Sequence, residues 1–215
     1  VRTHREWGGT GEVPSGERQG DGPWAMEADE QVAAAAWAAP TNVFVQAGVG
    51  SLAGAVVGYF ANKYPDNPPV FAVVESDQAD CLYRSACAGD GSIRTVGGDM
   101  RTIMAGLACG EPSITSWQIL KDKVSAFASL PDRVAADGMR VLGAPLPGDP
   151  RVTSGESGAA SLGFLYALMR DEELAPLREK LKLGKDSRVL LFSTEGATDP
   201  ENYRKVVWEG ACGSR

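Results

Sequence analysis

Glycines follow a short apolar segment at residues 43–46, and their spacing is that of an anion-binding turn. The segment VFVQ leads directly into Ala47-Gly48-Val49-Gly50-Ser51-Leu52. Closely spaced glycines let backbone N–H groups approach an anion, and a helix that starts here directs the positive end of its dipole at the same point. The sequence therefore predicts a strand-to-helix turn that binds a phosphate group, without indicating which phosphate compound.

Two other interpretations of this turn stay open at this stage. Gly48, Gly50 and Ala53 fit the G-x-G-x-x-A pattern of a dinucleotide-binding fold, and Glu75 ends the next expected strand, where an acid that binds ribose would lie. A G-x-G after a strand is common, however, and Glu75 lies somewhat farther along the chain than that pattern requires. Alternatively, the turn connects strand and helix without binding any ligand.

Residues 43–61 also form a run without a charged side chain, which raises the question of a membrane span. The run has nineteen residues, and two of its glycines, Gly50 and Gly54, have the spacing found where membrane helices pack together. Against a span stand Gln46, the lack of basic or aromatic anchors on both sides, and the position of the run within alternating strands and helices. We therefore expect no membrane partner.

The charge and the content of histidine and cysteine exclude several functions. The 215 residues include 28 acidic and 21 basic side chains, and the net charge of −7 opposes binding to nucleic acid. His4 is the only histidine in the sequence, so a histidine-based triad or zinc site lacks its residues. The cysteines have no metal-ligand spacing, and we expect reduced thiols in a cytoplasmic protein without a metal: Cys81, Cys87, Cys109 and Cys212.

Strand and helix patterns alternate along most of the chain. Continuous apolar strands, typical of a parallel sheet buried on both faces, are expected at 43–46, 70–75 and 188–193. A further strand and helix are expected within 125–143, where Ser129 would cap the helix and Pro131 would lie in its first turn. The pattern predicts an α/β fold, with a largely parallel sheet and flanking helices. The other helices are expected at 26–39, 51–63, 77–87, 101–109, 117–123, 158–171, 172–183 and 200–208.

Residues 1–24 are glycine-rich and have no periodic apolar face, so they cannot offset the entropy cost of ordering the backbone. We expect a disordered leader over residues 1–24 and one folded domain over residues 25–215. Because 43% of all residues are hydrophobic, that domain can bury a sizeable core.

Five stretches together resemble a known group of enzymes. In this order along the chain, they are similar to the diaminopropionate ammonia-lyases, within the tryptophan-synthase-β-like family of pyridoxal-phosphate (PLP) enzymes. The resemblance implies a partial fold-type-II PLP domain that corresponds to the C-terminal portion of such an enzyme. The stretches are PTNVFVQAGVGSLAG (40–54), VGGDMRTIMAGLACGEP (96–112), GMRVLG (138–143), RVTSGESGAASLG (151–163) and STEGATDPENYRKVVWEG (193–210).

The resemblance implies that eight residues bind pyridoxal 5′-phosphate. The turn after residue 46 matches the family's phosphate loop, which binds the cofactor phosphate through backbone amides. Ser193 matches a position whose hydroxyl faces the pyridine nitrogen, and a neutral partner there still permits β-elimination. Glu156 matches an acid near the cofactor ring, although an acid at the start of a helix would explain it equally well. The implied residues are Ala47, Gly48, Val49, Gly50, Ser51, Leu52, Glu156 and Ser193.

The implied reaction belongs to amino-acid catabolism and converts 2,3-diaminopropionate to pyruvate and ammonia, in a homodimer when the family protein has full length. It needs a Schiff-base lysine and a general base. In the family both lie in the N-terminal half, and no lysine precedes Val43 here. We therefore expect no catalytic residue in this chain and no activity of the chain alone. A non-catalytic phosphate-binding protein and a serine or threonine dehydratase-like enzyme are the alternatives.

Overall fold

The computed structural model describes residues 2–4 and 22–213. The strands are β1 (Arg2–His4), β2 (Asn42–Gln46), β3 (Val70–Ser76), β4 (Val124–Leu130) and β5 (Val189–Leu191). The helices are α1 (Gly22–Ala34), α2 (Ser51–Lys63), α3 (Cys81–Ala88), α4 (Ile114–Lys123), α5 (Asp132–Gly143), α6 (Ala160–Arg170), α7 (Ala175–Lys180) and α8 (Pro200–Val207). Two short 3-10 helices are η1 (Ala105–Leu107) and η2 (Glu172–Leu174).

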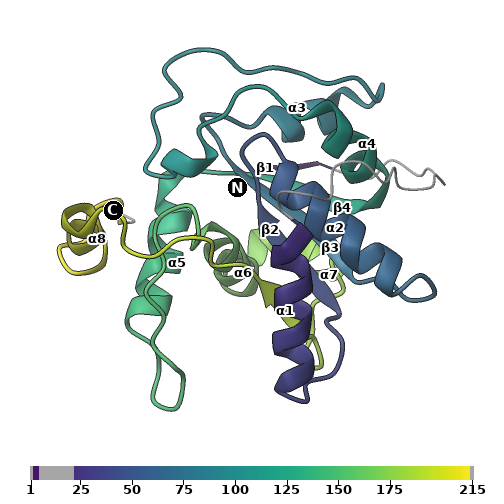
Figure 1. Ribbon diagram of the computed structural model, residues 1–215. Helices are drawn as coiled ribbons and strands as arrows, with labels where there is room; N and C mark the ends of the chain where they lie inside the picture. The colour runs from purple at the N-terminus through teal and green to yellow at the C-terminus, as the bar shows by residue number, and fades with distance from the viewer. Residues whose placement is uncertain (1, 5–21, 214–215) are drawn as a thin grey trace.

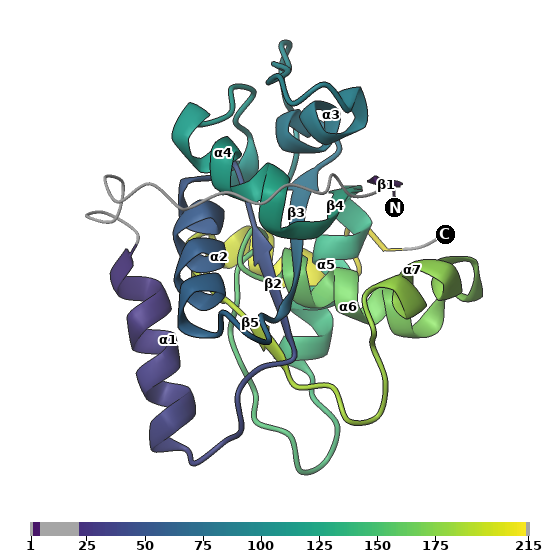
Figure 2. The same cartoon turned by 90° about the vertical axis from the view of Figure 1, so that its right-hand side faces the viewer.

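These strands form one sheet in the order β1-β4-β3-β2-β5 (Figure 1, and Figure 2, where β5 is also labelled). β4, β3, β2 and β5 run parallel to one another, whereas β1 pairs antiparallel with β4 at one edge. β2 pairs with β3 along its whole length, from Asn42 opposite Val70 to Gln46 opposite Val74. With β5, however, β2 pairs only as far as Phe44. The last two residues of β2 therefore extend beyond the end of β5.

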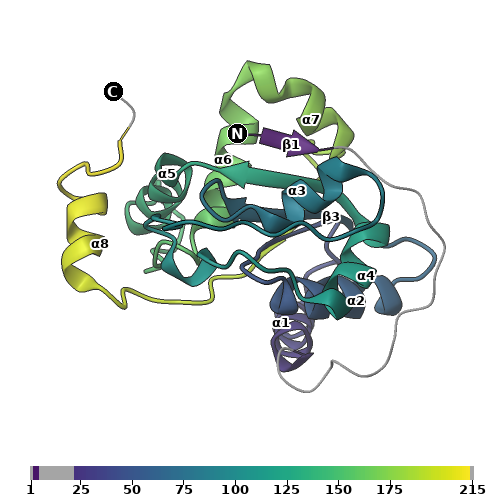
Figure 3. The ribbon, with the colours of Figure 1, turned by 90° about the horizontal axis from the view of Figure 1, so that it is seen from above.

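Helices cover both faces of the sheet, as Figure 2 and Figure 3 show from two sides. α1, α2 and α4 pack on one face, over a core that includes Val43 and Val45. α5, α6 and α7 pack on the other face, over a core that includes Phe44 and Val74. Neighbouring strand residues point to opposite faces, which explains why Phe44 and its neighbours belong to different cores. The predicted α/β fold with a largely parallel sheet and flanking helices is confirmed.

α5 and α6 cross at two glycines. A Cβ atom on Gly163 would lie 1.9 Å from the carbonyl oxygen of Val134, and a Cβ atom on Gly138 would lie 2.3 Å from that of Ala159. The two backbones can approach this closely only because neither glycine has a side chain. α8 packs on the outer side of α5, away from the sheet (Figure 1), where its Val206 is fully buried.

The uncharged run 43–61 divides into a strand, a turn and a helix. β2 ends at Gln46 and α2 begins at Ser51, so the interpretation as one continuous membrane helix is wrong. Among the residues that the structure describes, no helix combines the length and the apolar content needed to cross a bilayer. α2 spans Ser51–Lys63, as predicted from the glycine turn before it and the proline-rich segment after it.

The helix expected at 101–109 is wrong, because only η1 (Ala105–Leu107) is helical there. Contacts with distant parts of the chain hold this segment instead. The hydroxyl of Thr102 and the amide of Ile103 both donate to a carboxylate oxygen of Asp132 at the start of α5. The amide of Gly106 donates to the hydroxyl of Ser157 at 3.1 Å. These bonds are tertiary, so the apolar spacing of the segment does not indicate them.

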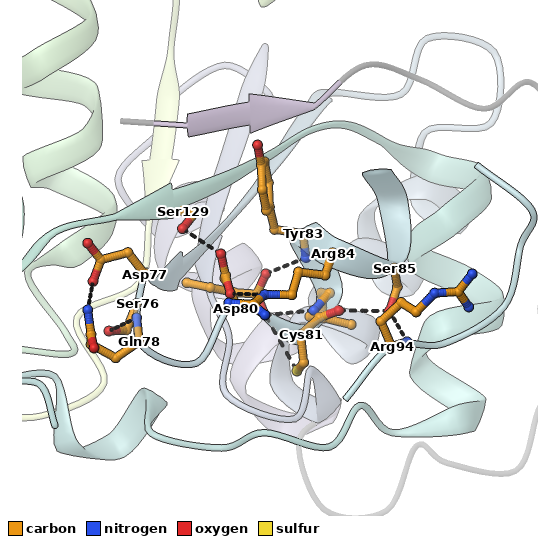
Figure 4. A network of polar contacts seen from close by, with 12 residues as sticks. Ser76, Asp77, Gln78, Asp80, Cys81, Tyr83, Arg84, Ser85, Arg94 and Ser129 are labelled. Atoms are coloured by element: carbon orange, nitrogen blue, oxygen red, sulfur yellow. Dashed lines mark hydrogen bonds and ion pairs between the residues drawn. The ribbon is translucent and has the colours of Figure 1, made fainter. Parts of the chain in front are cut away.

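Ser129 does not cap α5, contrary to expectation. β4 continues to Leu130 and keeps Ser129 within the sheet, where its hydroxyl donates to Oδ2 of Asp80 at 2.9 Å (Figure 4). The residue before α5 is Pro131, and no side-chain hydrogen bond caps this helix start. Asp80 also pairs with Arg84 at 2.7 Å, so one carboxylate joins the start of α3 to β4.

The strand expected at 188–193 is shorter and less buried than predicted. β5 spans only Val189–Leu191, and its three residues are half-buried. The reason is its place at the edge of the sheet, which a continuous apolar run does not reveal.

Part of the expected leader is described. Arg2–His4 form β1, which pairs with residues 127–129 of β4, and residues 22–24 form the first turn of α1. Residues 1 and 5–21 lie outside the described part of the chain. For residues 1 and 5–21 the expected disorder therefore stays a prediction.

Candidate active site

β2 lies where the path of the chain through the sheet reverses. From β2 the chain passes through α2 to β3 and then to β4, whereas β5 returns to the opposite side of β2. α2 and the helices that precede β5 also cover opposite faces. In open α/β sheets, ligands bind beyond the carboxyl ends of the strands at such a switch point. The candidate site therefore consists of residues 47–52 after β2 and residues 192–195 after β5.

The turn after β2 presents backbone amides at the start of α2. Gly50 has a φ of 97° and is the residue that precedes the helix. The amide of Ala47 donates to the carbonyl of Val74 at 2.9 Å, but no hydrogen bond found among the described residues uses an amide of residues 48–52 as its donor. Because these amides also lie at the positive end of the α2 dipole, the turn can hold an anion.

The segment 105–113 supports this turn from behind. A Cβ atom on Gly48 would lie 3.1 Å from Sγ of Cys109 and 3.2 Å from the carbonyl oxygen of Gly106. The carbonyl of Val49 accepts a hydrogen bond from the amide of Ser113 at 2.8 Å. The carbonyl group of Val49 thus faces the protein, and the free amides of the turn remain for a ligand.

Ser193 lies just beyond β5, and its side chain is exposed. Its hydroxyl donates to the hydroxyl of Ser154 at 2.8 Å, and Ser154 is fully buried. The side-chain amide of Gln46 donates to the carbonyl of Phe192 at 2.8 Å and to the hydroxyl of Thr194 at 2.9 Å. Gln46 therefore joins the end of β2 to both neighbours of Ser193.

Glu156 lies in the turn before α6 and is 7% exposed. Its Oε1 accepts a hydrogen bond from Nδ2 of Asn202, on α8, at 2.5 Å. The carboxylate is thus held by α8, and both roles considered for Glu156, as a cofactor contact and as an acid at a helix start, stay predictions.

Sequence reasoning missed several polar residues of this region. Glu195 Oε1 accepts hydrogen bonds from the amides of Ser157 at 2.6 Å and Gly158 at 3.3 Å. In the sequence, Gln46 counts only against a membrane span. The signal that could have indicated these residues is the density of small and polar residues in SGESG (154–158) and STEG (193–196).

Glu75 does not belong to a ribose site. It is fully buried, and its carboxylate accepts hydrogen bonds from the amides of Leu82 at 2.9 Å and Tyr83 at 2.6 Å, at the start of α3. Burial raises the pKa of Glu75 to about 8, and the two amides oppose that rise. The expectation of a ribose-binding acid at the end of β3 is therefore wrong.

All seven lysines lie in the described part of the chain, on elements other than residues 47–52 and 192–195. Lys63 pairs with Asp29, and Lys205 pairs with Glu201 at 2.7 Å. A cleft of about 770 Å³ lies at the amino ends of β2 and β3, on the opposite edge of the sheet, and three lysines line it. The remaining lysines belong to the ends of α4 and α7. The cleft lysines are Lys63, Lys182 and Lys185, and the others are Lys121, Lys123 and Lys180.

The cysteines are free thiols: Cys81, Cys87, Cys109 and Cys212. Within residues 2–4 and 22–213, no group of three or more histidine, cysteine, aspartate or glutamate side chains is placed to hold a metal ion.

Curated relatives match nearly the whole chain. The diaminopropionate ammonia-lyases of Salmonella typhimurium and Escherichia coli K12 are 50% identical to it over 205 and 204 residues, 95% of the chain in each case. The chain spans about half the length of these relatives, 51% and 50%. Because the first match leaves only a few residues of the 215 outside, it extends into the segment that we expected to be a leader.

Solved structures and a family model agree with this match. The Escherichia coli diaminopropionate ammonia-lyase in complex with an aminoacrylate-PLP azomethine intermediate superposes with a TM-score of 0.82 at 49% identity, over 91% of this chain and 49% of that chain. Maize serine racemase, at 20% identity and a TM-score of 0.66 over 88% of this chain and 53% of that one, shares the fold. The family model described as pyridoxal-phosphate dependent enzyme matches residues 17–194. This chain therefore belongs to the pyridoxal-phosphate dependent enzyme family.

Proposed function

We propose that this chain supplies the phosphate- and ring-binding part of a PLP-dependent ammonia-lyase that acts on 2,3-diaminopropionate. The observation that supports this most is the turn of free amides at residues 48–52, beside Ser193 at the switch point of the sheet. The 50% identity to enzymes named diaminopropionate ammonia-lyase supports the choice of substrate.

The residues present fit the cofactor. A phosphate dianion needs several N–H donors and a positive potential, which the turn and the α2 dipole provide. Ala47, buried beneath the turn, and Leu52, in the first turn of α2, would complete the phosphate contact. Ser193 would offer its hydroxyl to the ring nitrogen, because its side chain is exposed at the same edge. When bound, PLP supplies an electron sink for removal of a proton from the substrate's Cα.

We propose that none of the lysines of this chain is catalytic. The seven lysines either form ion pairs on helices or lie at the ends of elements and at the opposite edge of the sheet. We propose that the chain alone binds the cofactor reversibly and forms no pyruvate. A serine or threonine dehydratase is the weaker candidate, because the similarity to maize serine racemase, at 20% identity, extends to the fold alone. The homodimer and the cytoplasmic location stay predictions.

The test is titration of the purified chain with PLP, followed by borohydride reduction, mass spectrometry and a pyruvate assay with 2,3-diaminopropionate. We expect saturable binding that Ser193→Ala weakens and Ser187→Ala, a matched change at the opposite edge, leaves unchanged. Absence of saturable binding would contradict the proposed site. A single reduced lysine together with pyruvate would show that this chain carries its own catalytic lysine.

A second experiment separates the ammonia-lyase from a non-catalytic binding protein. The chain is joined to the half of the Escherichia coli relative that it does not match. Pyruvate formation by this chimera, and its loss in the chimera with Ser193→Ala, would support the ammonia-lyase. A folded chimera that binds PLP without forming pyruvate would favour the non-catalytic alternative.

A further inference from the structure

We infer that Gln46 and Glu195 act together as a clamp that positions Ser193 at a fixed distance from the turn 48–52. The inference rests on the proposed function, because the clamp would set the spacing between the phosphate and the ring nitrogen of one ligand. Neither residue is among those that the sequence predicted for the site.

Gln46 forms the first arm of the clamp. The backbone pairing between β2 and β5 ends at Phe44 opposite Leu191, so Ser193 has no place in the regular ladder. Instead of backbone pairing, the buried side chain of Gln46 holds this segment. Its Nε2 donates to the carbonyl of Phe192 at 2.8 Å and to the hydroxyl of Thr194 at 2.9 Å, on both sides of Ser193. Its Oε1 accepts from the hydroxyl of Ser161, on α6, at 3.0 Å. With its donors and its acceptor engaged, Gln46 is held in one orientation.

The position of Gln46 in the sequence connects this arm of the clamp to the phosphate turn. Gln46 immediately precedes Ala47, where the turn begins, so one residue connects the phosphate loop to the Ser193 segment. The two parts of the site therefore cannot move independently at this end.

Glu195 forms the second arm. Its carboxylate accepts from the amides of Ser157 and Gly158 at 2.6 and 3.3 Å, and its backbone carbonyl accepts from the amide of Gly155 at 3.1 Å. The turn 155–158 is therefore bound to Glu195 by three hydrogen bonds. The two bonds to the carboxylate are charge-assisted, and bonds of that kind are about twice as strong as neutral ones.

This second arm also leads back to the phosphate loop. The hydroxyl of Ser157 accepts from the amide of Gly106 at 3.1 Å. The carbonyl of Gly106 lies 3.2 Å from the place where a Cβ atom of Gly48 would be. Gln46 is thus linked to the turn 48–52 through Ala47, and Glu195 is linked to it through Ser157 and Gly106. Ser193 lies between these two links, and its own hydroxyl is bonded to Ser154.

The test compares two probes, inorganic phosphate and 4′-deoxypyridoxine phosphate, which has the cofactor's ring and phosphate but no aldehyde. We expect Gln46→Met and Glu195→Ala to weaken binding of the ring-containing probe about tenfold, because each removes hydrogen bonds that hold the Ser193 segment. Phosphate binding should weaken much less, since no residue of the turn 48–52 is changed. Glu195→Gln should restore binding, because an amide oxygen can still accept from Ser157. Glu201→Ala and Glu201→Gln, on the exposed face of α8, are the matched controls.

Amide hydrogen exchange, measured by NMR on the same variants without ligand, tests the clamp separately from the proposed function. We expect the amides of Ser157 and Gly158 to exchange at least about tenfold faster in Glu195→Ala, because they donate to the Glu195 carboxylate. In Gln46→Met we expect the backbone of residues 193–195 to become more mobile, with lower ¹⁵N heteronuclear NOE values. Unchanged exchange and unchanged backbone mobility in the two variants would overturn the clamp, as would an equal loss of affinity for both probes. If the wild-type chain binds neither probe, the proposed function is wrong, and the exchange rates still decide on the clamp.

Discussion

The turn between β2 and α2 and the crossing of α5 with α6 both require glycine, but for different physical reasons. At the turn, Gly50 adopts a φ of 97°, a conformation that other residues rarely take, and its neighbours present free amides. At the crossing, no positive φ is involved; Gly163 leaves room for the carbonyl of Val134. One region uses glycine for backbone conformation and ligand access, the other for close packing.

Sequence spacing alone does not distinguish a glycine that serves ligand binding from one that serves packing. Gly50 and Gly54 are four residues apart in the sequence, yet only Gly50 belongs to the turn. A Cβ atom on Gly54 would lie 2.8 Å from Cβ of Ser116, so Gly54 serves the contact between α2 and α4. Substitutions should therefore separate loss of stability from loss of binding.

The largest effect is expected at the helix crossing. Gly163→Ala places a methyl group 1.9 Å from a backbone oxygen, which only a shift of α5 or α6 can relieve. We expect a loss of roughly 3 kcal/mol or more in the free energy of unfolding, at or above the upper end for overpacking. Urea unfolding followed by circular dichroism measures this loss. Gly184→Ala, where no atom lies within 4 Å, is the control, and equal effects of both substitutions would refute the packing role.

A pH-dependent effect is expected from Glu75, which accepts a hydrogen bond from the amide of Leu82 at the start of α3. The side chain of Leu82 packs beneath Gly50. The folded protein keeps a proton on Glu75 up to a pKa of about 8, whereas the unfolded chain releases it near the ordinary value of 4.5. Between these values folding takes up a proton, so the contribution to stability is full below the lower value and is lost as the pH rises towards the upper one.

Glu75→Gln removes this proton uptake. The slope of unfolding free energy against pH should therefore become less negative by up to about 1.4 kcal/mol per pH unit between the two pKa values. Urea titrations at several pH values between 5 and 8 measure the slope, with the exposed Glu173→Gln as control. Parallel curves for wild type and Glu75→Gln would show that Glu75 is ionised throughout.

The smallest change in stability is expected at the turn, together with the clearest change in binding. Gly50→Ala forces an alanine into a left-handed conformation at a cost of about 1–2 kcal/mol. Its methyl group would also lie 3.1 Å from the flexible end of Leu82, which can give way. We expect loss of inorganic phosphate binding, measured by calorimetry, in a protein that stays folded. Retained phosphate affinity would show that the turn serves only as a connection.

Much of the fold follows from local sequence. α2 begins after a glycine turn and ends before a proline-rich segment. α8 begins directly after Asp199, whose carboxylate accepts from the amide of Asn202 at 2.9 Å. Signals of this kind involve residues within one turn of each other, so the sequence contains them directly. The helix expected at 101–109 fails because its backbone bonds to residues far along the chain.

The candidate site is only partly visible in the sequence for the same reason. The glycines of the turn adjoin their strand and helix, and a resemblance to a family indicates Ser193. Gln46 and Glu195 matter through partners 146 and 38 positions away. Local patterns cannot encode such partners, and the small polar residues around them are also typical of loops.

The placement of β5 beside β2 has a consequence for the order of folding. β2, β3 and β4 follow one another along the chain, so each pairing closes a relatively short loop. The pairing of β2 with β5 brings together residues such as Thr41 and Arg188, which are 147 positions apart. Closing so long a loop costs more chain entropy and slows the contact, so we expect β5 to join a sheet that has already formed. The Ser193 half of the site would then be completed last, and refolding monitored near residues 192–195 should lag behind refolding monitored at α2.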